Sequence, residues 1–346
     1  MTLNLHGRYG VIRKMHVAYH HHHHHHHIRF RSVRQSDVKD IIKFCRNTFS
    51  WGDYIPEVLE RWLTDPNGRL FLAEYKKGNY SRDPDISTVT IGISHVVICH
   101  KEELAWIEGI RIHRRYRRIK AATGLIKKML RYAKQQGTPE ISAIVGSDNA
   151  ASQNLLKKNG FKVISQWSYY ICKKNNNQDI RKTSARVASS KDIDKIWHYL
   201  KNSRIYRLSG RRYADSWRWY RFGRDVLKKF VKEKRLIVAG SGIITGVVVL
   251  NKSGYWDKSN VLQIIYLDSL STSSLEDLVS FTINLLYVHS RVHTHSFNYK
   301  CHYNGYSRFE RLQVLAYKTD QLSLTMKNFN IKESEQFLLY LKKIKI

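Results

Sequence analysis

Apolar residues recur along the first half of the chain with two alternating periods. Residues 28–33 alternate between apolar and polar side chains as a strand does, and Val38, Ile41, Ile42 and Cys45 then repeat at helical spacing. Further strands are expected at 69–75, 88–99, 105–112, 141–145 and 161–172, and further helices at 57–63, 121–136 and 150–158. The resulting order β-α-α-β-β-β-α-β-α-β predicts an α/β domain in which a mixed sheet is flanked by helices.

The order of elements then repeats after a polar stretch. Residues 187–197 echo 33–42, residues 234–239 echo 68–73, and residues 275–288 supply a helix in the place of 121–136. A repeat at so long a period predicts a duplicated domain, and two unrelated α/β domains are the alternative. The expected units are a disordered segment at 1–27 with eight consecutive His, a first domain at 28–173, a linker at 174–182 and a degenerate second copy at 183–346.

Composition narrows the function classes. The chain of 346 residues has 60 Lys and Arg against 28 Asp and Glu, a net charge of +32, and 42% hydrophobic residues. This hydrophobic content excludes a disordered chain, and no apolar run is long enough to predict a membrane span. The charge is spread over both halves and attracts polyanions, so nucleic-acid binding is an open alternative. Four scattered Cys fit a reducing compartment and hence a cytoplasmic location.

The most informative stretch is a strand that feeds a helix through a basic turn. The turn and the first helical residues are Arg117, Arg118, Lys120, Ala121, Ala122 and Thr123. Unpaired backbone N–H groups and the helix dipole favour an anion at such a helix start, and small side chains let it approach closely. The stretch therefore predicts a phosphate or pyrophosphate site, and a basic helix start without a ligand is the alternative.

These residues resemble the phosphate loop R/Q-x-x-G-x-G/A of the GNAT acyltransferases. Arg117 and Ala122 match the loop, whereas Lys120 stands at its first Gly. The later family signature matches at Asn149, Lys158 and Gly160-Phe161. Leu156 replaces the Tyr that often serves the family as general acid.

The resemblance covers about residues 28–172 and comprises several motifs in the family's order. Residues 51–56, 62–69 and 106–111 are similar to a subgroup that includes histidine N-acetyltransferases. The second half has no phosphate loop after its corresponding strand, so it is not expected to bind CoA.

The resemblance implies acetyl-CoA as cosubstrate and direct attack by an amine. The pantetheine arm is expected along the strand that ends in Ile110, Arg111 and Ile112, the pyrophosphate at the basic turn, and Asn149 in the cofactor site. Glu108 is the candidate base, with a structural carboxylate paired to an Arg as the equal alternative. Tyr169 or Tyr170 are substitutes for the missing acid.

The acceptor pocket is expected near the first pair of helices. Asp53 and Tyr54 are the candidate substrate residues, and a helix cap is the alternative role for Asp53. A strongly basic surface repels cationic proteins, which favours a small amine or amino acid admitted to an acidic pocket at Asp53 and Glu108. The predicted function is an N-acetyltransferase, and the alternative is a nucleic-acid-binding or protein-interaction module on a disabled acyltransferase scaffold.

Two other features carry weaker hypotheses. Residues 217–224 mix aromatic and Arg side chains and predict either a surface that stacks single-stranded bases or, preferably, an amphipathic helix that covers the second domain. His293 and His295 share one face of an expected strand, but a third ligand is not evident, so no metal site is predicted.

Overall fold

The computed structural model describes residues 28–46, 48–49, 52–76, 88–175, 181–252, 260–287 and 309–346. The predicted N-terminal segment with its His run, His293 and His295, and most of the predicted linker lie outside the described residues.

The first half contains every element that the hydrophobic pattern predicts, with bounds that differ by at most two residues. In chain order they are β1 (Ile28–Ser32), α1 (Val38–Cys45), α2 (Ile55–Thr64), β2 (Gly68–Lys76), β3 (Thr88–Cys99), β4 (Leu104–Ile112), α3 (Ala121–Gln135), β5 (Glu140–Gly146), α4 (Ala150–Lys158) and β6 (Lys162–Lys173). The α/β prediction for this half is confirmed.

The second half follows the same order with one added helix and one added hairpin. Its elements are β7 (Arg186–Val187), α5 (Ile193–Asn202), α6 (Arg204–Leu208), β8 (Arg212–Asp215), β9 (Arg218–Arg221), α7 (Arg224–Lys232), β10 (Leu236–Ala239), β11 (Gly246–Lys252), β12 (Val261–Ser269), α8 (Thr272–Tyr287), β13 (Arg311–Tyr317), α9 (Asp320–Asn328) and β14 (Lys332–Lys343). The helix predicted at 217–224 is wrong. Residues 218–221 pair with β8 as an antiparallel strand, in which Trp219 is buried and Arg221 is exposed.

An ion pair at the start of each half shows the duplication at the level of single residues. Arg31 Nη1 lies 2.7 Å from Asp37 Oδ2, and Arg186 Nη1 lies 2.8 Å from Asp192 Oδ2. Both aspartates also accept the backbone N–H three residues earlier, at the start of a helical turn. The Arg side chain and this hydrogen bond lower the pKa of both carboxyl groups. The predicted tandem arrangement of two similar α/β units is confirmed.

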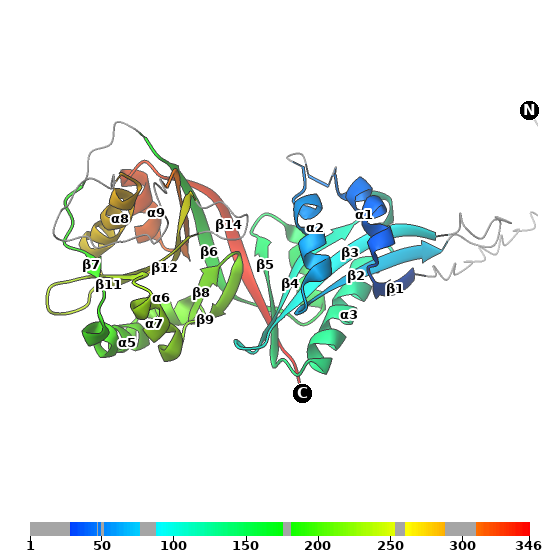
Figure 1. Ribbon diagram of the computed structural model, residues 1–346, viewed down its shortest axis with the longest axis horizontal. Helices are drawn as coiled ribbons and strands as arrows, with labels where there is room; N and C mark the ends of the chain where they lie inside the picture. The colour runs from blue at the N-terminus through cyan, green and yellow to red at the C-terminus, as the bar shows by residue number, and fades with distance from the viewer. Residues whose placement is uncertain are drawn as a thin grey trace, which may run out of the picture.

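All the long strands belong to one 12-stranded sheet, in which the two halves exchange their last strands. The order is β1-β2-β3-β4-β5-β14-β6-β13-β12-β11-β10-β7. The last strand of the second half, β14, therefore lies between β5 and β6 of the first half, and β6 lies between β14 and β13 (Figure 1). Neither half can move away from the other without breaking three strand ladders, β5–β14, β14–β6 and β6–β13.

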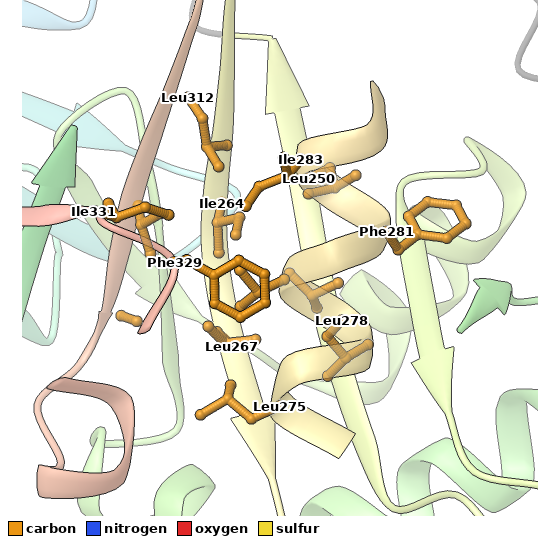
Figure 2. Packing of buried hydrophobic residues seen from close by; sticks show 14 of the residues in the cluster. Leu250, Ile264, Leu267, Leu275, Leu278, Phe281, Ile283, Leu312, Phe329 and Ile331 are labelled. Carbon is orange, nitrogen blue, oxygen red and sulfur yellow. The ribbon is translucent and has the colours of Figure 1, made fainter. Parts of the chain in front are cut away.

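Helices cover both faces of the sheet in each half. In the first half α3 packs on one face of β2, β3 and β4 while α1 and α2 cover the other. In the second half Leu275, Leu278 and Ile283 of α8 pack against strand residues such as Ile264 and Leu312 (Figure 2). No helix within the described ranges is long and apolar enough to cross a membrane.

A separate core joins the halves. Its buried residues come from β3, β4, β6, β8, β9, β13 and β14 and include Trp106, Trp167, Trp219, Leu315 and Leu339. Burial of three tryptophans in one cluster gives this junction a large apolar contribution to stability.

Candidate active site

The strands β4 and β5 separate along their length and open a cleft. They pair in parallel only at Ala105–Ile141 and Trp106–Ser142. A bulge in β4 contributes to the separation, because the register with β3 gains one residue at Gly109, which has φ +68°. A Cβ at Gly109 would lie 2.5 Å from the ring of Trp62, so this bend requires glycine. Beyond Trp106 the edge of β4, including Ile110 and Ile112, is not paired with β5.

The cleft holds a cavity of about 500 Å³ that residues of both halves line. The first half supplies the separated ends of β4 and β5, the start of α4 and one residue of β6. The second half supplies Trp217, Gln313, Glu335 and Phe337. The cavity is thus completed by the hairpin β8–β9 and by the exchanged strand β14.

Glu108 lines this cavity and is held by two side chains. Its Oε1 lies 2.9 Å from Nδ1 of His95 and 2.9 Å from Nη2 of Arg218, and its Oε2 accepts a 3.3 Å hydrogen bond from Nε of Arg218. Burial by itself raises the pKa of Glu108, but the His95 hydrogen bond and the Arg218 charge outweigh it and hold that pKa below its usual range. The carboxylate is therefore ionised at neutral pH.

Asp53 and Arg111, which sequence motifs assign to acceptor and cofactor, bind each other. Nε of Arg111 donates to Oδ2 of Asp53 at 2.7 Å and Nη2 donates to Oδ1 at 3.0 Å. Oδ1 also accepts the N–H of Ile55 at the start of α2. Tyr54 lies beside the pair and lines the cavity, and burial raises its pKa to about 12. Because Arg218 and Arg111 neutralise Glu108 and Asp53, these two carboxylates do not form a pocket of net negative charge.

The basic turn before α3 has the features of an anion site. Arg117, Arg118 and Lys120 are exposed, and none of them forms an ion pair among the described residues. The first i to i−4 hydrogen bond of the helix runs from Gly124 N to Lys120 O, at 3.1 Å, so the N–H groups of residues 121–123 have no partner within the helix. Lys120 has φ +64°, the left-handed conformation that the glycine of the similar motif adopts without strain.

The remaining predicted residues divide into those that line the cavity and those that do not. Asn149 caps α4 by accepting the Ser152 N–H at 3.1 Å and lines the cavity. Leu156 is buried at the cavity wall. Tyr169 also lines the cavity, and burial raises its pKa to about 12. Tyr170 packs in the core of the second half and lies outside the cavity lining.

Several residues that line the cavity belong to the second half of the chain, and the sequence motifs of the first half do not predict them. The Trp217 ring lies 4.8 Å from the Tyr169 ring and 5.6 Å from the Phe337 ring, and these three form an aromatic wall. Glu335 forms no ion pair within the part of the chain that is described, and burial together with nearby Asp148 raises its pKa. Only the exchange of β14 brings Phe337 and Glu335 here, and local periodicity carries no trace of that exchange.

The stretch for which base stacking is the less favoured hypothesis turns its largest aromatic side chains inward. Trp219 is fully buried and lies between the Trp106 ring at 5.9 Å and the Trp167 ring at 5.6 Å. Phe222, also buried, stacks on Tyr266 at 5.0 Å. These aromatic side chains pack in the interior and do not offer an exposed surface for base stacking.

Comparisons with known proteins agree with the fold. Residues 36–161 match the model of the Acetyltransferase (GNAT) family. A GCN5-related N-acetyltransferase from Sphaerobacter thermophilus superposes over 92% of this chain and 96% of its own, with a TM-score of 0.57 and 10% identity. A GCN5-related glucosamine N-acetyltransferase region of a fungal multi-domain beta-N-acetylglucosaminidase superposes over 92% of this chain and 38% of its own, with a TM-score of 0.55 and 11% identity. No curated protein matches the chain. At these identities the likeness to solved structures shows the fold alone.

Proposed function

Because residues 36–161 match the GNAT family and the fold agrees with that match, we propose that the protein is an acetyl-CoA-dependent N-acetyltransferase acting on a small primary amine. One observation carries the proposal. The cleft between β4 and β5 holds an ionised carboxylate, Glu108, and the strand that bears it leads into the exposed basic turn before α3. One continuous segment of the chain therefore carries a carboxylate that can take a proton from the amine and cations that can bind the phosphates of CoA.

The residues present fit acetyl-CoA as a substrate. Arg117, Arg118 and Lys120 with the free N–H groups of residues 121–123 would hold the phosphates. The backbone of β4 at Ile110, Arg111 and Ile112 would hold the pantetheine arm, since this edge of the strand is free of β5. Asn149 contributes to this site by fixing the start of α4 at the cavity.

The reaction is direct acyl transfer. The amine nitrogen attacks the thioester carbonyl, the new C–N bond forms, the C–S bond breaks and CoA leaves as a thiolate. The attacking amine must lose a proton, and Glu108 accepts it directly or through water. The thiolate gains a proton from Tyr169 or from solvent, because Leu156 has none to give. Tyr169 keeps its proton at neutral pH, since its pKa lies near 12.

The acceptor pocket fits a small cationic amine better than a protein. Its walls are aromatic at Trp217, Phe337 and Tyr54, and Glu335 is a lining carboxylate that forms no ion pair among the described residues. The chain as a whole has a net charge of +32, which disfavours approach of a basic protein. Free amino acids are the first acceptors to test, histidine among them, because the motifs at 51–56 and 106–111 resemble the histidine-acetylating subgroup.

A screen of amines tests this function. Purified full-length protein is incubated with acetyl-CoA and with single amino acids, amino sugars, polyamines or basic peptides, and released CoA thiol is measured. The proposal expects release with at least one small amine and little with basic peptides. Release with none of them, or with peptides alone, contradicts it.

A further inference from the structure

The hairpin β8–β9 is, together with strand β14, a part of the second half that packs into the first half. Arg212 and Arg221 both donate to Oε1 of Glu140 on β5, at 2.9 and 2.6 Å. Trp219 between them is fully buried against Trp106. The Arg212–Glu140 pair is buried, whereas Arg221 is partly exposed, and breaking a buried pair leaves an uncompensated charge.

From this fixed hairpin Arg218 reaches Glu108 with two hydrogen bonds, of 2.9 and 3.3 Å. A bidentate arginine restricts both the position and the plane of a carboxylate. Oε1 of Glu108 receives donors from both Arg218 and His95, whereas Oε2 receives only the longer bond. Oε2 is therefore the oxygen with remaining capacity for a proton from the cavity.

His95 holds the opposite side of the carboxylate. Its side chain is fully buried and stacks on Trp62 at 4.4 Å. Its Nε2 has no hydrogen-bond partner among the described residues. Because an ionised carboxylate only accepts hydrogen bonds, Nδ1 is the donor to Oε1 of Glu108, at 2.9 Å.

We propose that Arg218 is a positioning residue of the first half's active site, and that the second half serves to complete this site rather than to bind a CoA of its own. The inference rests on the proposed acetyltransferase function. It assigns a role to the degenerate copy, whose hairpin fixes the orientation and charge of the base in the other copy.

The charges around Glu108 explain why Arg218 matters. The titratable groups that face the carboxylate are His95 and Cys99 of β3, Tyr54 before α2 and Arg218 of β9. Burial raises the pKa of Cys99 to about 11 and that of Tyr54 to about 12, so both are neutral near pH 7. Among these groups Arg218 supplies the largest Coulombic stabilisation of the carboxylate. Without it, less opposes the effect of burial, and the pKa of Glu108 rises.

The test uses the full chain with Arg218→Gln and Arg218→Lys. With the acceptor found in the amine screen, Arg218→Gln should move the acid side of the kcat profile upward by roughly 1 to 3 pH units. Its KM for acetyl-CoA should stay unchanged. Arg218→Lys keeps the charge and loses the bidentate geometry, so it should restore most of the profile. Arg224→Gln, which removes an exposed pair with Asp194, is the matched control and should change nothing.

An acid limb at the same pH in folded Arg218→Gln and in the parent overturns the inference, even if kcat falls equally at every pH. If the parent acetylates no amine, the proposed function fails first, and the inference is then judged by NMR of 13C-labelled Glu. In that measurement the Glu108 signal, assigned from Glu108→Gln, should titrate at higher pH in Arg218→Gln, and in Arg218→Lys should stay near the parent. An unshifted titration overturns the inference by itself.

Discussion

Arg111 and Asp53 neutralise each other in a buried pair, with hydrogen bonds of 2.7 and 3.0 Å. The Asp53 side chain is 0% exposed and that of Arg111 is 10% exposed. The pair joins the end of β4 to the start of α2, on the wall of the cavity. This geometry gives Asp53 a structural task that a role in substrate binding would have to displace.

Removal of the Asp53 side chain should therefore lower the free energy of unfolding more than it changes the affinity for the substrate. Asp53→Ala leaves a buried, unpaired arginine and should lower the free energy of unfolding by about 3 kcal/mol or more. The double variant Asp53→Ala with Arg111→Met should recover much of that loss. Urea unfolding measures both, and Asp194→Ala at an exposed pair should cost less than about 1 kcal/mol. If Asp53→Ala is as stable as the parent and only the KM for the amine rises, Asp53 binds substrate.

Glu108→Gln tests the base. The variant keeps the shape of the side chain but cannot take a proton, so kcat should fall by a factor of about 100 or more while acetyl-CoA affinity stays within about twofold. Steady-state kinetics and calorimetry measure the two quantities. Glu103→Gln, at an exposed carboxylate of the neighbouring turn, is the control. Unchanged turnover in Glu108→Gln would remove Glu108 from the mechanism.

The lowered pKa of Glu108 also sets a pH dependence. A lowered pKa means that the ionised form persists below the usual value of about 4.3, so the base remains competent as the pH falls through 6 and 5. The parent's kcat should show no acid limb from Glu108 between about pH 5 and 8. A limb in that window that disappears in Glu108→Gln would show that the carboxyl group is protonated more easily than its contacts imply.

Two substitutions of Lys120 test both the anion site and the left-handed backbone conformation of its turn. Lys120→Gly and Lys120→Ala both remove the cation, so each should weaken acetyl-CoA binding by a similar factor of roughly 10. Only glycine relieves the left-handed conformation, so Lys120→Gly should be more stable than Lys120→Ala by about 1 kcal/mol. Calorimetry and thermal unfolding of the pair measure both effects. Equal stability of the two variants would mean that the turn is not held at positive φ.

Glu335 tests which carboxylate meets the acceptor. Glu335→Gln should raise the KM for a cationic amine by roughly three- to tenfold, because hydrogen bonds to charged groups are worth about 1.5 kcal/mol or more. The KM for acetyl-CoA should not change. Glu333→Gln, on the same strand but outside the cavity lining, is the control. An equal effect of both variants would point to the general field of the surface rather than to contact at the cavity.

The sequence predicted those structural features that depend on residues close to one another along the chain. The strand and helix periods placed every element of the first half, and the basic turn with Glu108 followed from motif spacing. The exchange of β6 and β14 could not be predicted, because it pairs strands that lie about 170 residues apart and leaves no local period. The bulge at Gly109 and the left-handed Lys120 are single-residue backbone features that composition does not show.

Only part of the candidate site could be predicted from the sequence, for the same reason. Glu108 lies 110 positions before Arg218, and Asp53 lies 58 positions before Arg111, so neither pairing has a spacing signal. The alternation of residues 217–221 was available as a clue, since aromatic and Arg positions there follow a strand period as well as a helical one. Because residues 217–224 were interpreted as a helix, the sequence did not show that this hairpin reaches the candidate active site.

The most direct test of the account is mass spectrometry of the acceptor amine after incubation with acetyl-CoA and the full chain. The account predicts that a small amine, identified in the amine screen, gains one acetyl group with the parent protein and that this gain falls at least about 100-fold with Glu108→Gln. An acceptor that gains no acetyl group, or gains it equally with Glu108→Gln, would contradict an acetyl transfer that depends on Glu108 in the cleft between β4 and β5.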